Sequence, residues 1–231
     1  MNRVETITFV YNEEFLLPFY LRHYAFVDRM NIIYDTDSVD GTLSILQGCA
    51  KVNVIPFTFP DAMDNQLKVD QINRIYKGLL NCWVFNVDCD EFIFFDKLPA
   101  LPMNSVALHN VFRHHSEGDL KVDAPIKKQR RYGFLDPQFY IKPVVVRSGL
   151  DIQWAVGNHN ILGIDRPFRY YDGAHWANAD PCFTVKRRAQ DRTNRISVAD
   201  REKGYGFHKY NVTEQSIIEY LEDHENERRL W

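Results

Sequence analysis

The sequence contains no stretch that approaches the roughly 20 apolar residues a transmembrane helix needs. It also shows no signal-peptide pattern, because Met1 is followed directly by a β-prone run with no separate apolar region. None of its four cysteines forms a CxxC pair, and their spacing is unlike that of a disulfide-stapled secreted scaffold. We therefore expect a cytoplasmic protein, with peripheral contact at the inner face of the membrane as an open alternative.

The composition has no surplus of positive charge. The 28 Lys and Arg residues are outnumbered by 31 Asp and Glu, giving a net charge of −3, so we expect no nucleic-acid partner. Hydrophobic residues make up 45% of the 231 residues and charged residues 26%, as in ordinary globular proteins. The chain is long enough for one large domain with a full core, and it contains no internal repeat.

Strand and helix patterns alternate over the first hundred residues, which predicts an α/β fold with a mainly parallel, twisted sheet flanked by helices. The predicted strands are 4–10, 31–34, 52–57, 83–87, 106–112 and 142–147. The predicted helices are 17–26, 43–49, 65–80, a charged helix within 187–206, and a terminal amphipathic helix over 213–223. We divide the chain into a donor-binding half (1–98), an acceptor-side half (99–210) and a C-terminal helical extension (211–231).

The run from Trp83 to Phe94 is apolar except for Asn86 and three carboxylates at its centre. Strand alternation predicts that Asp88 and Asp90 point to one face and Glu91 to the other. Two buried carboxylates on one face repel each other unless a cation lies between them. Oxygen ligands of this kind suit Mn²⁺ or Mg²⁺, which also bind phosphate; the alternative is an ordinary acidic strand end.

Two further polar segments follow the first and second predicted strands. The first is Tyr11-Asn12-Glu13-Glu14, and the second runs from Asp35 to Thr42 with the sequence DTDSVDGT. The carboxyl ends of parallel strands share one edge of a sheet, so these segments and the carboxylates should meet there. Turn formation and helix capping would also explain the second segment.

In these three segments the sequence resembles the family-2-like glycosyltransferases with the GT-A fold, particularly the bacterial branch that carries Asp-x-Asp-Glu, here residues 88–91. The resemblance covers roughly residues 4–97 and is fainter through the segments around Lys142, Gly157, Gly173 and Gly204. It implies a nucleotide-diphospho-sugar donor, such as a UDP-sugar, and a metal bound by Asp88 and Asp90. By similarity, the donor-binding residues are Val10, Asn12, Glu13, Asp35, Asp37 and Asp40.

Later residues would complete such a site. Proteins of this fold often supply a histidine to the metal, and we favour His159 over His175 and His208. An inverting transfer also needs a carboxylate to accept the proton of the acceptor hydroxyl. Glu117 and Asp119 are the candidates, ahead of Glu91.

The sequence therefore predicts a metal-dependent, inverting hexosyltransferase that elongates a surface polysaccharide or lipopolysaccharide on a glycan or glycolipid acceptor. A nucleotidyltransferase is a weaker alternative, because Tyr11-Asn12-Glu13-Glu14 lacks the expected Gly-rich, basic phosphate loop. A non-catalytic protein that binds a glycan or a nucleotide is the second alternative. The basic run 127–131 indicates a solvated face or contact with phosphate or a membrane surface.

Overall fold

The structure is a computed structural model that describes residues 3–94, 97–135, 140–163, 170–193, 195–206 and 210–231. Within these ranges nine strands form one sheet in the order β3-β2-β1-β4-β8-β6-β11-β5, with β7 paired to β6. They are β1 (Arg3–Val10), β2 (Arg29–Asp35), β3 (Val52–Phe57), β4 (Cys82–Asn86), β5 (Glu91–Phe94), β6 (Met103–Phe112), β7 (Tyr132–Phe134), β8 (Ile141–Arg147) and β11 (Tyr170–Asn178). A separate hairpin joins β9 (Gln153–Trp154) to β10 (Ile161–Leu162).

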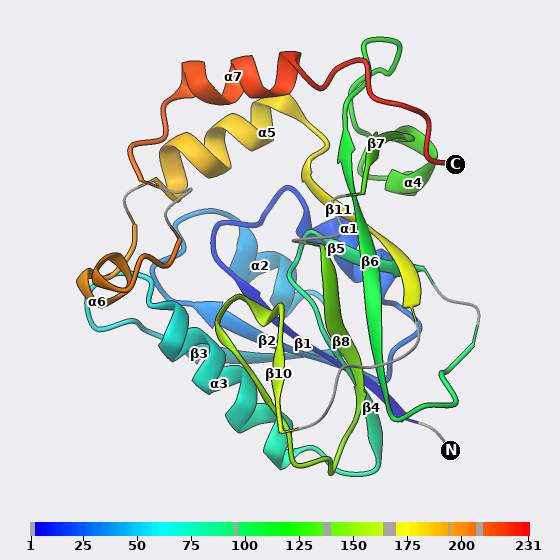
Figure 1. The fold of residues 1–231 in the computed structure, drawn as a ribbon, viewed down its shortest axis with the longest axis vertical. Helices are drawn as coiled ribbons and strands as arrows, with labels where there is room; N and C mark the ends of the chain where they lie inside the picture. Colours follow the sequence, from blue (N-terminus) through cyan, green and yellow to red (C-terminus); the bar gives the residue numbers. More distant parts are fainter. Residues whose placement is uncertain (1–2, 95–96, 136–139, 164–169, 194, 207–209) are drawn as a thin grey trace.

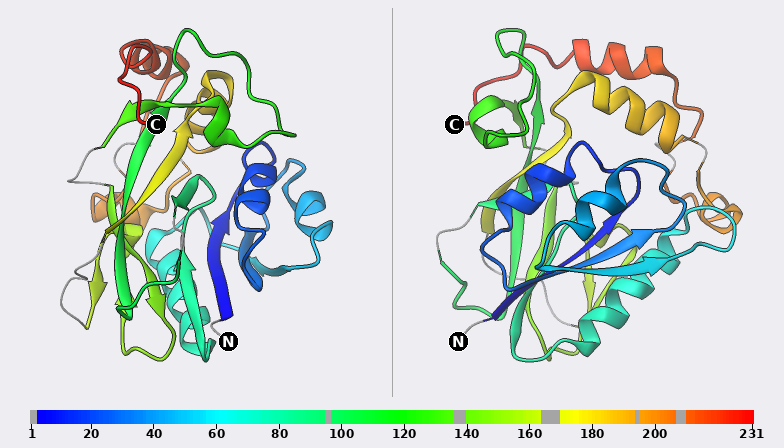
Figure 2. Two further views of the ribbon diagram at one scale, coloured as in Figure 1. Left: turned by 90° about the vertical axis from the view of Figure 1, so that its right-hand side faces the viewer. Right: turned by 180° about the vertical axis from the view of Figure 1, so that it is seen from behind.

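The helices cover both faces and the upper end of this sheet (Figure 1). They are α1 (Leu17–His23), α2 (Thr42–Gln47), α3 (Asn65–Gly78), α4 (Ile126–Gln129), α5 (Pro181–Val185), α6 (Val198–Glu202) and α7 (Glu214–Glu222), with a 3₁₀ turn η1 (Val156–Asn158) and a π-helical turn η2 (Lys186–Asp191). Views from the side and from behind place α1 and α2 on one face and α3 on the other (Figure 2). Of three apolar clusters in the described ranges, one packs around α1, another around α3, and a smaller third joins Phe112 to Ile217 and Leu221 of α7.

The predicted α/β fold is confirmed, and its parallel part is the block β3-β2-β1-β4. Predicted strand 52–57 has the observed bounds of β3, and the helix over 65–80 is α3. Beyond β4 the sheet is mixed, since β8 is antiparallel to both β4 and β6 while β11 is parallel to β6. Strand β11 was not predicted. It lies between β6 and β5 in the sheet, and its residue His175 is paired with Asn110 of β6 and Glu91 of β5.

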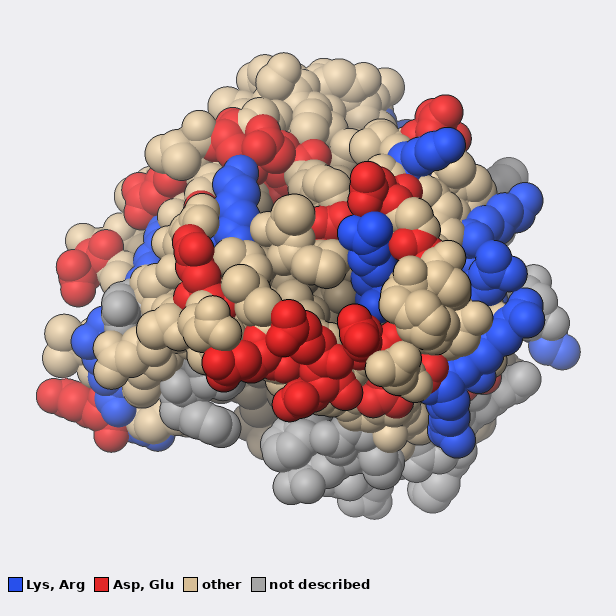
Figure 3. Space-filling model, turned by 90° about the horizontal axis from the view of Figure 1, so that it is seen from above, with Lys and Arg blue, Asp and Glu red and all other residues tan. Residues whose placement is uncertain are grey.

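The terminal helix α7 is amphipathic as predicted, with Ile217 and Leu221 buried. Seen from above, the molecule shows Asp and Glu side chains gathered in a band across its surface, and the outer face of α7 is acidic (Figure 3). The basic run 127–131 is only partly solvated: Arg130 is fully buried, and its Nε donates to the Ala179 carbonyl at 2.5 Å. No helix in the described ranges is both long enough and apolar enough to cross a bilayer.

His23 links α1 to β5 and makes stability depend on pH. Its Nε2 lies 3.0 Å from the Ile93 carbonyl and its ring stacks on Phe92, so burial lowers the pKa of His23 to about 4. Between pH 6.5 and 4 the unfolded chain takes up a proton here that the folded chain does not, so stability falls as the pH falls. We expect this histidine to cost about 1–3 kcal/mol of unfolding free energy from pH 7 to 4.5.

Urea unfolding at the two pH values measures this loss, with His23→Phe and His224→Phe compared to the wild type. The His23 variant should lose less stability on acidification than the wild type. The His224 control should lose as much stability as the wild type. Equal losses in the wild type and the His23 variant would show that His23 is protonated in the folded state.

Candidate active site

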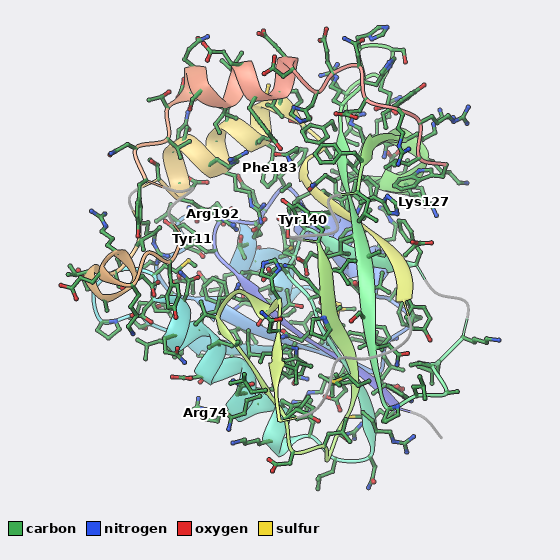
Figure 4. The ribbon with its side chains drawn as sticks, in the orientation of Figure 1. Tyr11, Arg74, Lys127, Tyr140, Phe183 and Arg192 are labelled. Atoms are coloured by element: carbon green, nitrogen blue, oxygen red, sulfur yellow. The ribbon has the colours of Figure 1, made fainter. Side chains whose placement is uncertain are left out.

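The loops that follow β1, β2 and β4 meet at one edge of the parallel block, below α5 and η2. A cavity of about 640 Å³ opens there. The residues that line it include Tyr11, Glu13, Lys68, Asp88, Asp90, Tyr140, Lys142, His159, His175, Asn178, Arg187, Arg188, Arg192, Arg195 and Tyr205. Figure 4 shows Tyr11, Tyr140 and Arg192 around this central region, with Arg74 far off on α3.

The first two loops are bonded to each other through their predicted motif residues. Asn12 has a left-handed backbone (φ 50°), a conformation that asparagine tolerates better than most residues. Its amide oxygen accepts from the Val39 N–H at 2.9 Å. The two Asp40 carboxylate oxygens accept backbone N–H groups of Thr42 and Glu14. The structure therefore uses Asn12 and Asp40 to fix the shape of the loops, and neither is among the described residues of the cavity lining.

Asp35, at the end of β2, is fully buried beside Tyr11 and Arg195. An Nη2 atom of Arg195 lies 2.8 Å from Asp35 and 3.0 Å from Asp37, while its guanidinium lies 3.8 Å from the Tyr11 ring centre. Burial raises the pKa of Asp35, against the opposing effect of its bonds to the Asp37 N–H and to Arg195. Tyr11 and Arg195 line the cavity, whereas Asp35 is not among the described residues of the lining and contacts it through Arg195.

Glu13 and Asp90 are bound by the same buried arginine. Arg187 donates to Glu13 from Nε at 3.1 Å and from Nη2 at 2.7 Å, and its Nη1 bonds Asp90. Arg192 donates a further bond to Glu13. Burial alone would raise the pKa of Asp90, but Arg187 and then His175 outweigh it and hold that pKa well below its usual range.

A π-helical turn brings the two arginines together. The Arg192 N–H donates to the Arg187 carbonyl at 3.1 Å, a five-residue bond in place of the usual four-residue one. In an α-helix, residues five apart point in well-separated directions, and the wider turn reduces that separation. Both guanidinium groups consequently reach one carboxylate of the first loop.

Asp88 faces a different pair of cations. Lys68 Nζ lies 2.9 Å from Asp88, and Lys142 bonds Glu91 and lies 3.9 Å from Asp88. Burial opposes ionisation of Asp88, yet Lys68 and Lys142 hold its pKa well below the usual range. Strand β4 ends at Asn86, so the predicted alternation does not extend through the carboxylates: Asp88 and Glu91 share Lys142, and Asp90 faces Arg187.

The arrangement does not fit a preformed divalent-metal site. Among the described residues, no group of three or more His, Cys, Asp or Glu side chains is placed to hold a metal ion. Lys68 occupies one carboxylate oxygen of Asp88, and Arg187 occupies one of Asp90, so a metal between them would lie beside two protein cations. Protein side chains already place cations beside both carboxylates. Binding of Mn²⁺ or Mg²⁺ by Asp88, Asp90 and His159 stays a prediction.

The three candidate histidines differ in position. His159 and His175 both line the cavity, and His208 falls outside the described residues. His175 Nδ1 lies 2.9 Å from the Asn110 amide oxygen, which can only accept. Its Nε2 lies 3.4 Å from an Asp90 carboxylate oxygen.

The carboxylates predicted as catalytic bases lie apart from the described cavity lining. Glu117 is nearly buried, and its two oxygens accept the backbone N–H groups of Arg131 (3.0 Å) and His114 (3.2 Å). Asp119 is 89% exposed and pairs with Arg113. The geometry gives Glu117 a role in holding its loop together and gives Asp119 a surface position.

Sequence reasoning missed the cations of the site, namely Lys68, Lys142, Arg187, Arg192 and Arg195. A signal was present for two of them. Lys142 interrupts an otherwise apolar strand, and Arg187 follows a buried helical start, so both should have been matched with buried carboxylates. The pairings themselves span up to 179 residues of sequence and could not be read from local patterns.

No family model and no curated protein sequence matches this chain. Among solved structures, S. aureus TarS 1–349 is 14% identical, with a TM-score of 0.44 over 80% of this chain and 62% of that one. The same protein in complex with UDP-GlcNAc is 16% identical, with a TM-score of 0.45 over 97% of this chain and 72% of that one. CTP:phosphocholine cytidylyltransferase (LicC) from Streptococcus pneumoniae is 13% identical, with a TM-score of 0.32 over 64% of this chain and 69% of that one. The chain spans 62% and 47% of the first two TarS structures, and the likeness to all of these proteins is distant.

Replacing Glu117 separates a structural from a catalytic role. We expect Glu117→Gln to lower the unfolding free energy by about 1 kcal/mol, because an amide nitrogen replaces one of two oxygens that accept backbone N–H groups. Asp119→Asn, at an exposed position, should change it by less than about 0.5 kcal/mol. Urea unfolding measures both. A Glu117 variant of native stability that has lost sugar transfer would reinstate Glu117 as the base.

Proposed function

We propose that this chain is a GT-A-type glycosyltransferase that moves a sugar from a nucleoside-diphospho-sugar to a glycan acceptor. The observation that carries the proposal is the cavity at the carboxyl edge of the parallel strands, where Tyr11, Asp88 and Asp90 meet a group of Lys and Arg side chains. Ligands of open α/β sheets bind at this edge. Buried positive groups beside an aromatic ring and a carboxylate suit a nucleoside diphosphate.

The nucleoside is assigned to the end of the cavity formed by Tyr11 and Arg195, where Asp35 binds the Arg195 guanidinium. A base can stack on the Tyr11 ring or on the planar guanidinium that now covers it. Asp35 becomes an acceptor for a base N–H when Arg195 moves away from its carboxylate. The diphosphate then extends toward Arg187, Arg188 and Arg192. UDP is the proposed nucleotide.

In the proposed reaction, the acceptor hydroxyl oxygen forms a bond to the anomeric carbon as the bond from that carbon to the diphosphate breaks. The bonding electrons leave with the diphosphate, whose added charge the cavity cations stabilise. The hydroxyl proton passes to a base. His159 lines the cavity, whereas Glu117 and Asp119 do not, so His159 is the better placed group for this step. His175 also lines the cavity, but its two ring nitrogens face Asn110 and Asp90. An inverting course remains our proposal.

A second cavity of about 370 Å³ adjoins the first and is the proposed acceptor site. Asn178 lines both cavities and is only 4% exposed. Its amide oxygen bonds no other described group. Phe112, His115 and Glu222 also line the second cavity, a mixture of ring and polar groups that suits a carbohydrate. The acceptor is proposed to be a surface glycan or glycolipid, reached by peripheral membrane contact.

The two alternatives make different predictions for the same cavity. A nucleotidyltransferase would bind a nucleoside triphosphate and release pyrophosphate, and a non-catalytic protein would bind its ligand without turnover. Conversion of a UDP-sugar to UDP, either by slow hydrolysis or with added glycan, distinguishes the proposed transferase from both.

Binding of UDP to the wild type and to Asp35→Ala tests the donor site by calorimetric titration. We expect the variant to bind UDP about ten times more weakly, because it loses a buried acceptor for the base. Asp70→Ala, an exposed position on α3, is the matched control and should bind UDP as the wild type does. No binding of UDP, CDP, GDP or dTDP by the wild type would contradict the proposed function.

A further inference from the structure

The carboxylates that line the cavity already have basic partners. Asp88 is bonded by Lys68, Asp90 by Arg187, and Glu13 by Arg187 and Arg192. A divalent cation between Asp88 and Asp90 would therefore enter a region already occupied by buried positive groups, which it would repel. The charge balance of the site is met by the protein itself.

Arg188 is different from the other basic residues of the lining. It lies between Arg187 and the η2 residues that follow, over the Tyr220 ring at 5.3 Å, and no described carboxylate pairs with it. Burial lowers the pKa of Arg188, and the neighbouring Arg187 lowers it further. The guanidinium nevertheless stays charged at neutral pH. A half-buried guanidinium with no anionic partner is stabilised by an anion that enters the cavity.

The π-helical turn makes this arrangement possible. It directs Arg187 and Arg192 to Glu13, where they hold the first loop, while Arg188 also lines the cavity. Two guanidiniums thus serve the protein's own carboxylates and a third is left for a ligand. Guanidinium matches phosphate oxygens in a bidentate geometry.

We propose that Arg188 binds the diphosphate of the donor, and that the basic residues of η2 take the place of a divalent metal at this site. The inference rests on the proposed function, since it names how that donor is held. In the transfer step, Arg188 stabilises the charge that the diphosphate gains when the bond to the sugar breaks. Asp88 and Asp90 then serve to position Lys68 and Arg187.

The test is calorimetric titration of UDP and of uridine into the full chain, each in EDTA and in MnCl₂. UDP affinity should differ by less than about twofold between the two conditions. Arg188→Ala should weaken UDP about ten- to a hundredfold and leave uridine unchanged, because only UDP carries the phosphates. Arg188→Lys, which keeps the charge but loses the bidentate contact, should recover part of the affinity. Thermal melting confirms that each variant is folded.

Arg74→Ala is the matched control, since Arg74 is exposed on α3 away from the cavity (Figure 4). It should bind UDP as the wild type does. UDP binding that strengthens tenfold or more with Mn²⁺, and that loses this gain in Asp90→Ala, overturns the inference but leaves the proposed function standing. Equal loss of UDP and uridine in folded Arg188→Ala also overturns it. Failure of the wild type to bind any nucleoside diphosphate overturns both.

Discussion

The structure depends on a buried ionic link between Arg187 and the carboxylates of Glu13 and Asp90. Glu13 follows β1, Asp90 follows β4, and Arg187 comes from the helical segment placed over the edge of the sheet. All three side chains are at least 95% buried. An unpaired charge at such depth is strongly destabilising, so the three elements are held in one arrangement by the need to keep every charge paired.

This requirement also determines the character of the cavity. The helical segment must bring arginines to the sheet edge, and the widened η2 turn carries Arg188 there along with Arg187 and Arg192. A positively charged pocket therefore lies at the carboxyl ends of the parallel strands, which is where α/β proteins bind ligands. Loop shape, charge compensation and ligand preference follow from the same set of contacts.

The first half of the fold was predictable because its signals are local. Alternating strand and helix patterns gave the parallel block, and the polar segments at Tyr11, Asp35 and Asp88 were expected at one edge. Strand β11 escaped prediction because its sequence, with Gly173 and His175 in the interior, lacks a period-two apolar pattern. Partners more than 90 residues apart in sequence, such as Arg187 and Asp90, are set by tertiary packing alone.

A double-mutant cycle on Glu13→Gln and Arg187→Met, followed by urea unfolding, tests whether the buried link between these two residues stabilises the fold. Each single change should cost about 3–5 kcal/mol, because it removes one partner from a network of buried charges in which Glu13 then keeps only Arg192, or Arg187 only Asp90. The double variant should be more stable than the sum of the two losses predicts, by more than about 1 kcal/mol. Losses that add to within about 0.5 kcal/mol would contradict the claim, because they would show that the two residues are energetically independent.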